Sequence, residues 1–182
     1  MLVYHGTTAQ GLQNIINGSE EKHVSPWTVC DNDGIMYVYP SDKVAREHGL
    51  DLEEDFEEVQ QCARQTCFEQ AQLQVLCNDE TEIFVIEFDI DESLLEDDYS
   101  CDNMADSASC FDMKEFDASR IQSIVKHTVN VYHKPFIAVN VIHNHNFNVD
   151  ALDPELLAAA ETISEAGVYL EAVTEFDFEE EF

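Results

Sequence analysis

Apolar and polar residues alternate in several short stretches of the chain, and this alternation predicts strands. The runs at 2–5, 35–39 and 83–90 have the two-residue period of half-buried strands. Residues 121–132 alternate in the same way, and residues 135–142 predict a further strand. The expected core positions of the fourth run are Ile121, Ile124, Val125, Val129 and Val131. In the third run, Glu87 and Asp89 lie on the polar side, where they would face solvent or a cleft.

Two short helices are predicted directly after the first two strands. Thr7 and Gln10 have the spacing of a capping box, so the first helix begins at Thr7 and ends at Gly18. The second helix covers 43–48 and is closed by Gly49. Each strand of this pair therefore leads through a tight turn into its own helix.

Two longer helices are predicted further along the chain. The first covers 51–77 and has an apolar stripe made of Leu52, Phe56, Val59, Ala63, Cys67 and Ala71. The second begins at Asp153-Pro154, with proline at the first helical position, and continues to about residue 173. Strands and helices together predict an α+β fold in which helices flank a sheet.

The net charge of −31, from 39 acidic and 8 basic residues, changes what the chain can bind. Nucleic-acid affinity depends on Lys and Arg that neutralise phosphates, so the charge argues against direct binding of DNA or RNA. Anionic membrane surfaces are disfavoured for the same reason. A basic protein partner is favoured instead, and a protein that normally holds nucleic acid has the matching surface. Adaptation to high salt is the alternative explanation.

Acidic residues gather in three places that form the expected partner-binding surface. One is the start of the long helix, where acids also complement the helix dipole. The others are the connection 91–110 and the C-terminus, which a frayed and solvated chain end would also explain. The residues of this surface are Glu53, Glu54, Asp55, Glu57, Glu58, Asp97, Asp98, Glu179, Glu180 and Glu181.

The cysteine and histidine patterns predict neither a metal site nor a disulfide framework. Six cysteines without a Cys-x-x-Cys pair, behind an N-terminus unlike a signal peptide, predict reduced thiols and a cytoplasmic protein. His143 and His145 would share one face of a strand, but no third ligand is evident in the sequence. No stretch is long and apolar enough to cross a bilayer.

Five segments combine into a recognisable order along the first two thirds of the chain. They are the strand end His5-Gly6-Thr7, the strand start Gly34 to Tyr37, the short helix Ser41 to Ala45, the strand Ile83 to Ile90 and the turn Phe116 to Ile121. In this order they resemble the ADP-ribosyltransferase superfamily. The resemblance implies a domain at 1–134 with a split, mixed or antiparallel sheet. Residues 135–182 would add a strand, an acidic C-terminal helix and a tail packed on that domain.

The resemblance also implies a cofactor and the residues that hold it. Members of the family cleave NAD at the nicotinamide–ribose bond and transfer ADP-ribose to an acceptor. His5 would hydrogen-bond the ribose, while Gly6 and Thr7 would border the nucleotide, with Gly6 allowing close approach to the backbone. Tyr37 or Tyr39 would stack on the nicotinamide.

The catalytic acid is the point at which the chain departs from the family pattern. Cleavage develops positive charge on the ribose, which a nearby carboxylate stabilises. Asp112 stands where the family usually has Glu or Gln and is one methylene shorter, while Glu115 would need a shift in register. The pyrophosphate would be received by backbone amides and by Lys43, Arg46 and Arg120.

Two hypotheses of different classes follow from these patterns. The first is an enzyme that uses NAD to mono-ADP-ribosylate a host protein, in a viral or mobile-element role against host defence. The second is a non-catalytic inhibitor on the same scaffold, whose carboxylates imitate the phosphates of DNA or RNA and block a basic restriction, nuclease or defence protein. His5, Gly6, Thr7 and Tyr37 favour the enzyme, whereas Asp112 and the charge favour the inhibitor. A plain acidic partner-binding protein is the third possibility.

Overall fold

A computed structural model describes residues 1–18, 34–77, 80–98, 106–144 and 149–166 of the chain. The predicted surface residues Glu179, Glu180 and Glu181, together with His145, lie outside these ranges. The described residues form an α+β fold in which helices flank a sheet, as the sequence predicts. The described sheet has six strands, of which those at 96–97 and 109–112 are not among the predicted strands.

All strand pairs of the described sheet are antiparallel. Their order is β4-β5-β2-β1-β3-β6. The strands are β1 (Leu2–Thr8), β2 (Ile35–Pro40), β3 (Glu82–Asp89), β4 (Glu96–Asp97), β5 (Ser109–Asp112) and β6 (Ile121–Thr128). The predicted strands at 2–5, 35–39 and 83–90 are therefore confirmed with small differences at their ends, and the strand predicted at 121–132 is confirmed only as far as Thr128.

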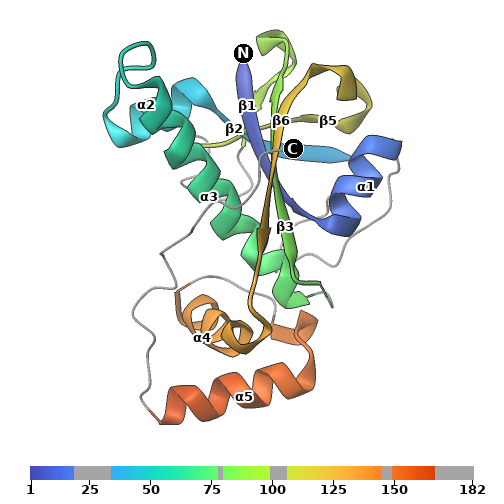
Figure 1. Cartoon of the computed structure of the whole chain (residues 1–182), viewed down its shortest axis with the longest axis vertical. Helices are drawn as coiled ribbons and strands as arrows, with labels where there is room; N and C mark the ends of the chain where they lie inside the picture. Colours follow the sequence, from blue (N-terminus) through green and yellow to red (C-terminus); the bar gives the residue numbers. More distant parts are fainter. Residues whose placement is uncertain (19–33, 78–79, 99–105, 145–148, 167–182) are drawn as a thin grey trace.

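The sheet has two parts that meet between β1 and β2. The β1–β3 ladder runs the full length of β1, from Leu2 opposite Asp89 to Thr8 opposite Ile83. The paired residues of β1 and β2 are only Val3 with Pro40 and Tyr4 with Tyr39. Beyond these pairs the strands diverge, and β2 and β5 run across β1, β3 and β6 (Figure 1).

The helices that follow β1 and β2 are closed as the sequence predicts. Helix α1 (Ala9–Asn17) ends at Gly18 and α2 (Ser41–His48) ends at Gly49, and both glycines have positive φ. The predicted capping box at Thr7 is wrong by one residue. Thr8 is the N-cap, because its hydroxyl accepts from the backbone N–H of Gly11 while Thr7 still belongs to β1.

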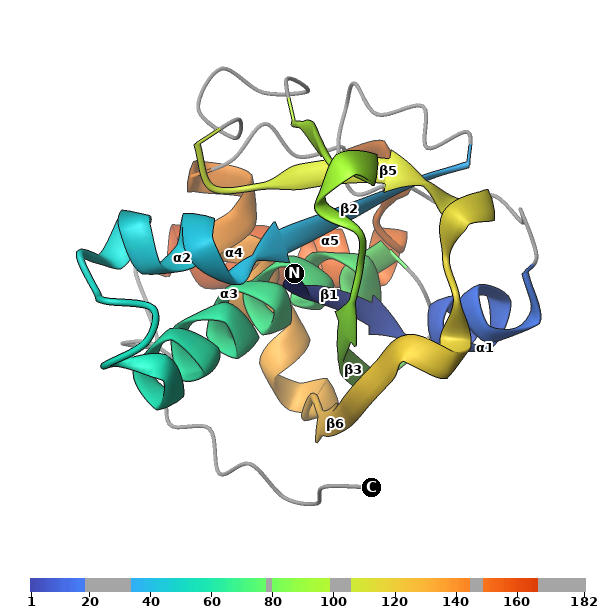
Figure 2. The same cartoon turned by 90° about the horizontal axis from the view of Figure 1, so that it is seen from above.

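Helix α3 (Phe56–Cys77) packs on one face of the sheet and α1 lies on the opposite side of β1 (Figures 1 and 2). Four residues of the apolar stripe predicted for α3 are fully buried: Val59, Ala63, Cys67 and Ala71. The helix begins five residues later than predicted, because Asp51 accepts from the N–H groups of Glu53 and Glu54 and forms a preceding turn. Phe56, at the helix start, is 44% exposed and does not belong to the core.

The predicted strand at 135–142 is wrong, because these residues belong to helix α4 (Lys134–Asn144). Ile137, Ala138 and Val139 are buried at consecutive positions, between α3 and α5 (Pro154–Glu165). A helix covered on several sides has a continuous apolar run, which resembles that of a buried strand. Val131, predicted as core, is 59% exposed in the 3-10 turn before α4. Asp153 caps α5 as predicted.

Candidate functional site

His5 lies at the point where β1 and β2 diverge. Its Nδ1 is 2.7 Å from the backbone oxygen of Tyr37, so the ring bridges the two strands just beyond their last ladder pair. A carbonyl oxygen only accepts, so Nδ1 carries the proton. In the neutral ring Nε2 is then an acceptor. The ring is half-buried. His5 therefore connects the two strands that carry the predicted motifs.

The two motifs point to opposite faces of the sheet. Tyr4 and Tyr39 lie in the core beneath α3, and strand alternation puts Tyr37 on that same face. Val3 and Val38 lie in the core on the other face, and alternation puts the side chain of His5 with them. His5 thus meets Tyr37 through the backbone of that residue.

The two tyrosines differ in how much of their surface a ligand could reach. Tyr39 is buried, and burial raises the pKa of its phenol well above the ordinary value. Its ring is part of the core beneath α3. Tyr37 is half-buried and keeps part of its surface exposed. Of the two tyrosines predicted to stack on nicotinamide, Tyr37 is the accessible one.

Gly6 and Thr7 have structural environments that explain their residue types without a ligand. A Cβ atom on Gly6 would lie 2.1 Å from the backbone oxygen of Cys67, so the glycine allows α3 to pack closely on β1. A Cβ atom on Gly11 of α1 would likewise collide with the hydroxyl oxygen of Thr7, which is buried. The close approach to the backbone of Gly6 that the resemblance implies for a nucleotide is made instead by helix α3.

The two candidate acids lie at the end of β5. The carboxylate of Asp112 accepts from the backbone N–H of Lys114 and caps the 3-10 turn Met113–Glu115, in which Glu115 lies. Both side chains are exposed. Phe111 packs in the core on the face of His5, so alternation puts Asp112 on the opposite face. The described structure brings β5, β2 and β1 side by side but does not bring either acid to His5.

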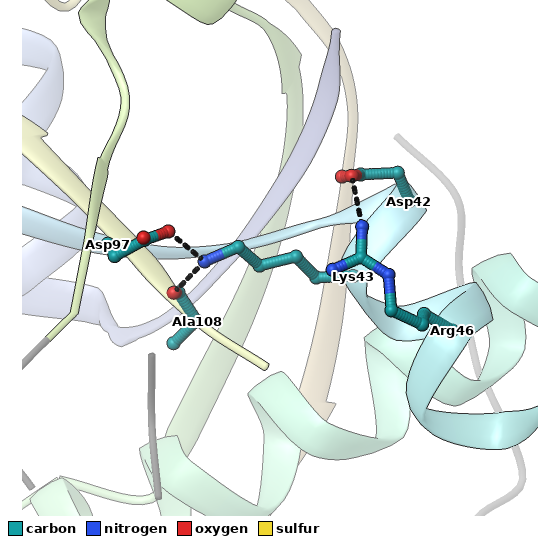
Figure 3. Close-up of polar contacts among 5 residues, drawn as sticks. All are labelled: Asp42, Lys43, Arg46, Asp97 and Ala108. Carbon is teal, nitrogen blue, oxygen red and sulfur yellow. Dashed lines mark hydrogen bonds and ion pairs between the residues drawn. The ribbon is translucent and has the colours of Figure 1, made fainter. Parts of the chain in front are cut away.

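The three cations expected to receive a pyrophosphate are each paired with an acid of the chain. Lys43 contacts Asp97 at 2.8 Å and donates to the backbone oxygen of Ala108 at 2.7 Å (Figure 3). Arg46 pairs with Asp42 at 3.3 Å, and Arg120 lies 3.9 Å from Asp117. The side chain of Lys43 is 11% exposed and that of Arg46 is 68% exposed. Lys43 is therefore a structural cation, whereas Arg46 and Arg120, the latter 51% exposed, are accessible.

The predicted acidic surface is present only in part. Its exposed members at the start of α3 are Glu53, Glu54, Glu57 and Glu58. Asp55 is partly covered and accepts from the N–H of Asp51. Asp97 is half-exposed and paired with Lys43. Asp98 is only 3% exposed, so the prediction that it belongs to the acidic surface is wrong. It directly follows β4, where its N–H faces the backbone oxygen of Ala108.

A buried polar cluster beneath α3 was not predicted from the sequence. Glu87 is 2% exposed rather than directed to solvent or a cleft. Its carboxylate forms an ion pair with Arg64 and accepts from Gln60 at 3.2 Å and from Ser123 at 2.7 Å. Burial, with the added charge of Glu87, raises the pKa of Cys67. In the sequence, Gln60 and Arg64 lie four residues apart beside the buried stripe of the long helix. This spacing could have indicated a buried acidic partner.

The described cysteines and acids build no reactive or metal-binding centre. Cys62, Cys67, Cys77 and Cys110 are free thiols. Burial and then the charge of Asp98 raise the pKa of Cys110, which makes it a poorer nucleophile. The described side chains contain no group of three or more His, Cys, Asp or Glu arranged to hold a metal ion. No helix within the described ranges has both the length and the apolar character needed to span a membrane.

No protein-family model, curated protein or solved structure matches this chain. The family resemblance therefore depends on the motifs themselves and on how the fold arranges them.

Proposed function

We propose that this protein is an ADP-ribosyltransferase-like protein that binds NAD beside His5, where β1 and β2 diverge. The observation that carries the proposal is the bond between His5 Nδ1 and the backbone oxygen of Tyr37, which joins the two motif strands at the break in the sheet. The divided antiparallel sheet supports the same proposal, since a split sheet is what the resemblance implies.

The family resemblance assigns the chemistry to groups on three adjacent strands. His5 on β1 holds its ring with Nε2 as acceptor, which suits a ribose hydroxyl donor. Tyr37 on β2 offers a partly exposed ring for the nicotinamide on the face opposite His5, so the cofactor would pass through the opening where β1 and β2 diverge. The family resemblance gives Asp112 or Glu115, at the end of β5, the role of stabilising the positive charge on the ribose, which requires the cofactor to extend from His5 past the break in the sheet to the opposite face. The acceptor is a basic host protein, drawn to the acidic surface in a viral or mobile-element role against host defence.

A second candidate function is supported by the distribution of charge. The described cations Lys43, Arg46, Arg64, Arg120 and Lys126 form ion pairs with acids. Among the described residues, none of these pairs involves the four exposed glutamates at the start of α3. A non-catalytic inhibitor would use such carboxylates as mimics of nucleic-acid phosphates against a basic nuclease, restriction or defence protein.

The two functions are separated by two sets of variants. Nicotinamide release from NAD is measured with a host lysate as acceptor, for the parent protein, His5→Ala and Asp112→Asn with Glu115→Gln. His48→Ala is the matched control, because His48 is exposed at the end of α2. The proposal predicts release that requires His5 and one of the acids and does not require His48. Release that is absent from the parent protein contradicts it.

The inhibitor is tested by replacing Glu53, Glu54, Glu57 and Glu58 with glutamine in one variant. Salt-sensitive capture of a basic nucleic-acid-binding protein by the parent chain, lost in this variant and retained in His5→Ala, would favour the inhibitor. Capture that survives neutralisation of all four glutamates would count against it. Because the replacements are exposed, they are expected to change stability by less than about 0.5 kcal/mol each.

A further inference from the structure

Lys43 is a buried lysine whose ammonium joins three segments of the chain. It lies in the first turn of α2, three residues after β2 ends at Pro40. Its Nζ contacts Asp97 at 2.8 Å and the backbone oxygen of Ala108 at 2.7 Å (Figure 3). The side chain is 11% exposed. An ammonium held by a carboxylate and a carbonyl in a covered position makes strong, charge-assisted hydrogen bonds.

The two acceptors stand on either side of the connection between β4 and β5. Asp97 is the last residue of β4, and Ala108 directly precedes the first residue of β5. The backbone contact between the two ends of this connection is weaker than the contacts of Lys43, since the N–H of Asp98 lies 3.4 Å from the oxygen of Ala108. One side chain from α2 therefore fixes both ends of this connection to the helix that follows β2.

Strand β5 is short, and besides its ladders it is held by Phe111 in the core and by the bond from the Met113 N–H to the oxygen of Gly34 at 2.7 Å. Its ladder with β2 extends only from Val38 opposite Ser109 to Ile35 opposite Asp112. The β4–β5 ladder is shorter still. A slip of one residue in such a strand would turn every side chain to the other face of the sheet. Lys43 holds the first end of β5, and Asp112 stands at the last.

We propose that Lys43 is a positioning residue that fixes the register of β5 against β2 and so places the acid-bearing end of β5 relative to Tyr37. The link to catalysis rests on the proposed function, whereas the clamp itself does not. The lysine acts through β5 and does not touch the substrate. This role replaces the pyrophosphate contact that the sequence suggests for Lys43.

Arg46 provides a matched control on the next turn of α2. It is a cation on the same helix with one acidic partner, Asp42, but its side chain is 68% exposed (Figure 3). An exposed pair four residues apart on a helix contributes little to stability. Lys43→Met and Arg46→Met remove the same charge with the same new side chain. Any difference between them therefore reports the buried contacts to Asp97 and Ala108.

The direct test is amide hydrogen exchange on the full chain, with β3 as an internal reference. In Lys43→Met, protection of Cys110 and Phe111 should fall by about tenfold to a hundredfold, the loss expected for one charge-assisted hydrogen bond. Protection of Val85 and Ile86 in β3 should not change. Arg46→Met should behave like the parent protein, and Lys43→Arg should recover most of the protection in β5. Unchanged protection of β5, or an equal loss in β3 and β5, overturns the clamp.

The catalytic part has its own readout in nicotinamide release. If Lys43 positions the acid, Lys43→Met should lower kcat by about a hundredfold, as expected for a displacement of about an ångström. KM for NAD should stay within about twofold, because the lysine does not contact the cofactor. A kcat equal to that of the parent protein overturns the positioning role. If the parent protein releases no nicotinamide, the proposed function fails, and hydrogen exchange alone then decides the clamp.

Discussion

The two parts of the sheet are held together in different ways. Strands β1, β3 and β6 pair along most of their lengths and are covered on one face by α3, whose buried stripe packs on them. Strands β2, β5 and β4 have short ladders, and side chains add the missing ties: His5 to the backbone of Tyr37, and Lys43 to Asp97 and Ala108. The first part is a backbone scaffold, and the second depends on individual side chains.

This difference bears on function, because the candidate residues gather in the second part and at its junction with the first. Tyr37, Asp112 and Glu115 belong to β2, β5 and the turn after β5, and His5 stands at the junction. Functional segments are commonly drawn from the less stable regions of a protein. Breaking the first part should therefore unfold the molecule, whereas breaking the second should change the site.

The largest expected effect is loss of the buried ion pair in the first part. Arg64→Met should lower the free energy of unfolding by about 3–5 kcal/mol, because it leaves the carboxylate of Glu87 charged and buried without its cation. Urea denaturation measures the loss. Adding Glu87→Leu to this variant should recover much of the stability, since the unpaired charge is then gone. A loss below about 1 kcal/mol for Arg64→Met would contradict the scaffold role of the cluster.

The next effect compares the two parts within the unmodified protein. Amides of Val85 and Ile86 in β3 should exchange only through global unfolding, and those of Cys110 and Phe111 in β5 through local opening. We expect protection in β5 to be lower by about a hundredfold or more. Hydrogen exchange followed by NMR measures both in one sample. Equal protection in the two strands would remove the distinction between scaffold and site.

Gly6→Ala tests the contact between β1 and α3. The added Cβ would meet the backbone oxygen of Cys67 at 2.1 Å, so the helix must shift, at a cost of about 1–3 kcal/mol. Gly34→Ala is the control, because its Cβ would meet nothing and only its positive φ is strained. Denaturation midpoints of both variants measure the difference. A Gly6→Ala variant as stable as the parent protein would mean that α3 is not in close contact with β1.

The pH dependence of stability should report His127, which lies in β6 with its ring 4.8 Å from that of Phe68. Burial, and then the charge of Arg64, hold the pKa of His127 below its ordinary value. The unfolded chain therefore takes up this proton at a higher pH than the folded chain. Stability should fall as the pH falls through the ordinary histidine pKa, and the fall should end below the folded pKa.

Melting temperatures measured between about pH 7.5 and 5.5, which bracket the ordinary histidine pKa, test this dependence. His127→Gln should flatten the curve in this range. His48→Gln should leave it as it is, because His48 is exposed. A curve of the same slope in His127→Gln and the parent protein would assign the dependence to another group.

The smallest expected effect concerns the hydroxyl of Tyr4. It is buried in the first part of the sheet and has no hydrogen-bond partner among the described residues. Tyr4→Phe should leave stability unchanged or raise it by up to about 1 kcal/mol, because an unsatisfied polar group is removed. Denaturation by urea is sensitive enough to measure this change. A clear loss of stability would instead reveal a partner of the hydroxyl, such as a buried water molecule.

Local signals explain how much of the fold could be predicted from the sequence. Gly18, Gly49 and Asp153 mark helix ends by rules that involve only neighbouring residues, and all three are confirmed. The error in α4 has the opposite origin. Ile137 and Val139 are both buried because α3 and α5 cover α4 on more than one side. The apolar residues of α4 therefore show no helical period in the sequence.

The candidate site was less accessible to sequence reasoning, because it depends on pairing between distant residues. Glu87 is buried beside Arg64, which lies 23 positions earlier, and Asp98 is covered although the segment around it is acidic. The motifs His5-Gly6-Thr7 and Tyr37 were found by their order along the chain. Only strand register shows that their side chains point to opposite faces of the sheet.

The most direct test of the account is binding and turnover of NAD by the purified protein. Saturable binding up to millimolar NAD, followed by nicotinamide release with host lysate, is the expected result. His5→Ala should abolish both, and His48→Ala should change neither. Absence of NAD binding by the parent protein at millimolar concentration would contradict the proposed site at the junction of β1 and β2.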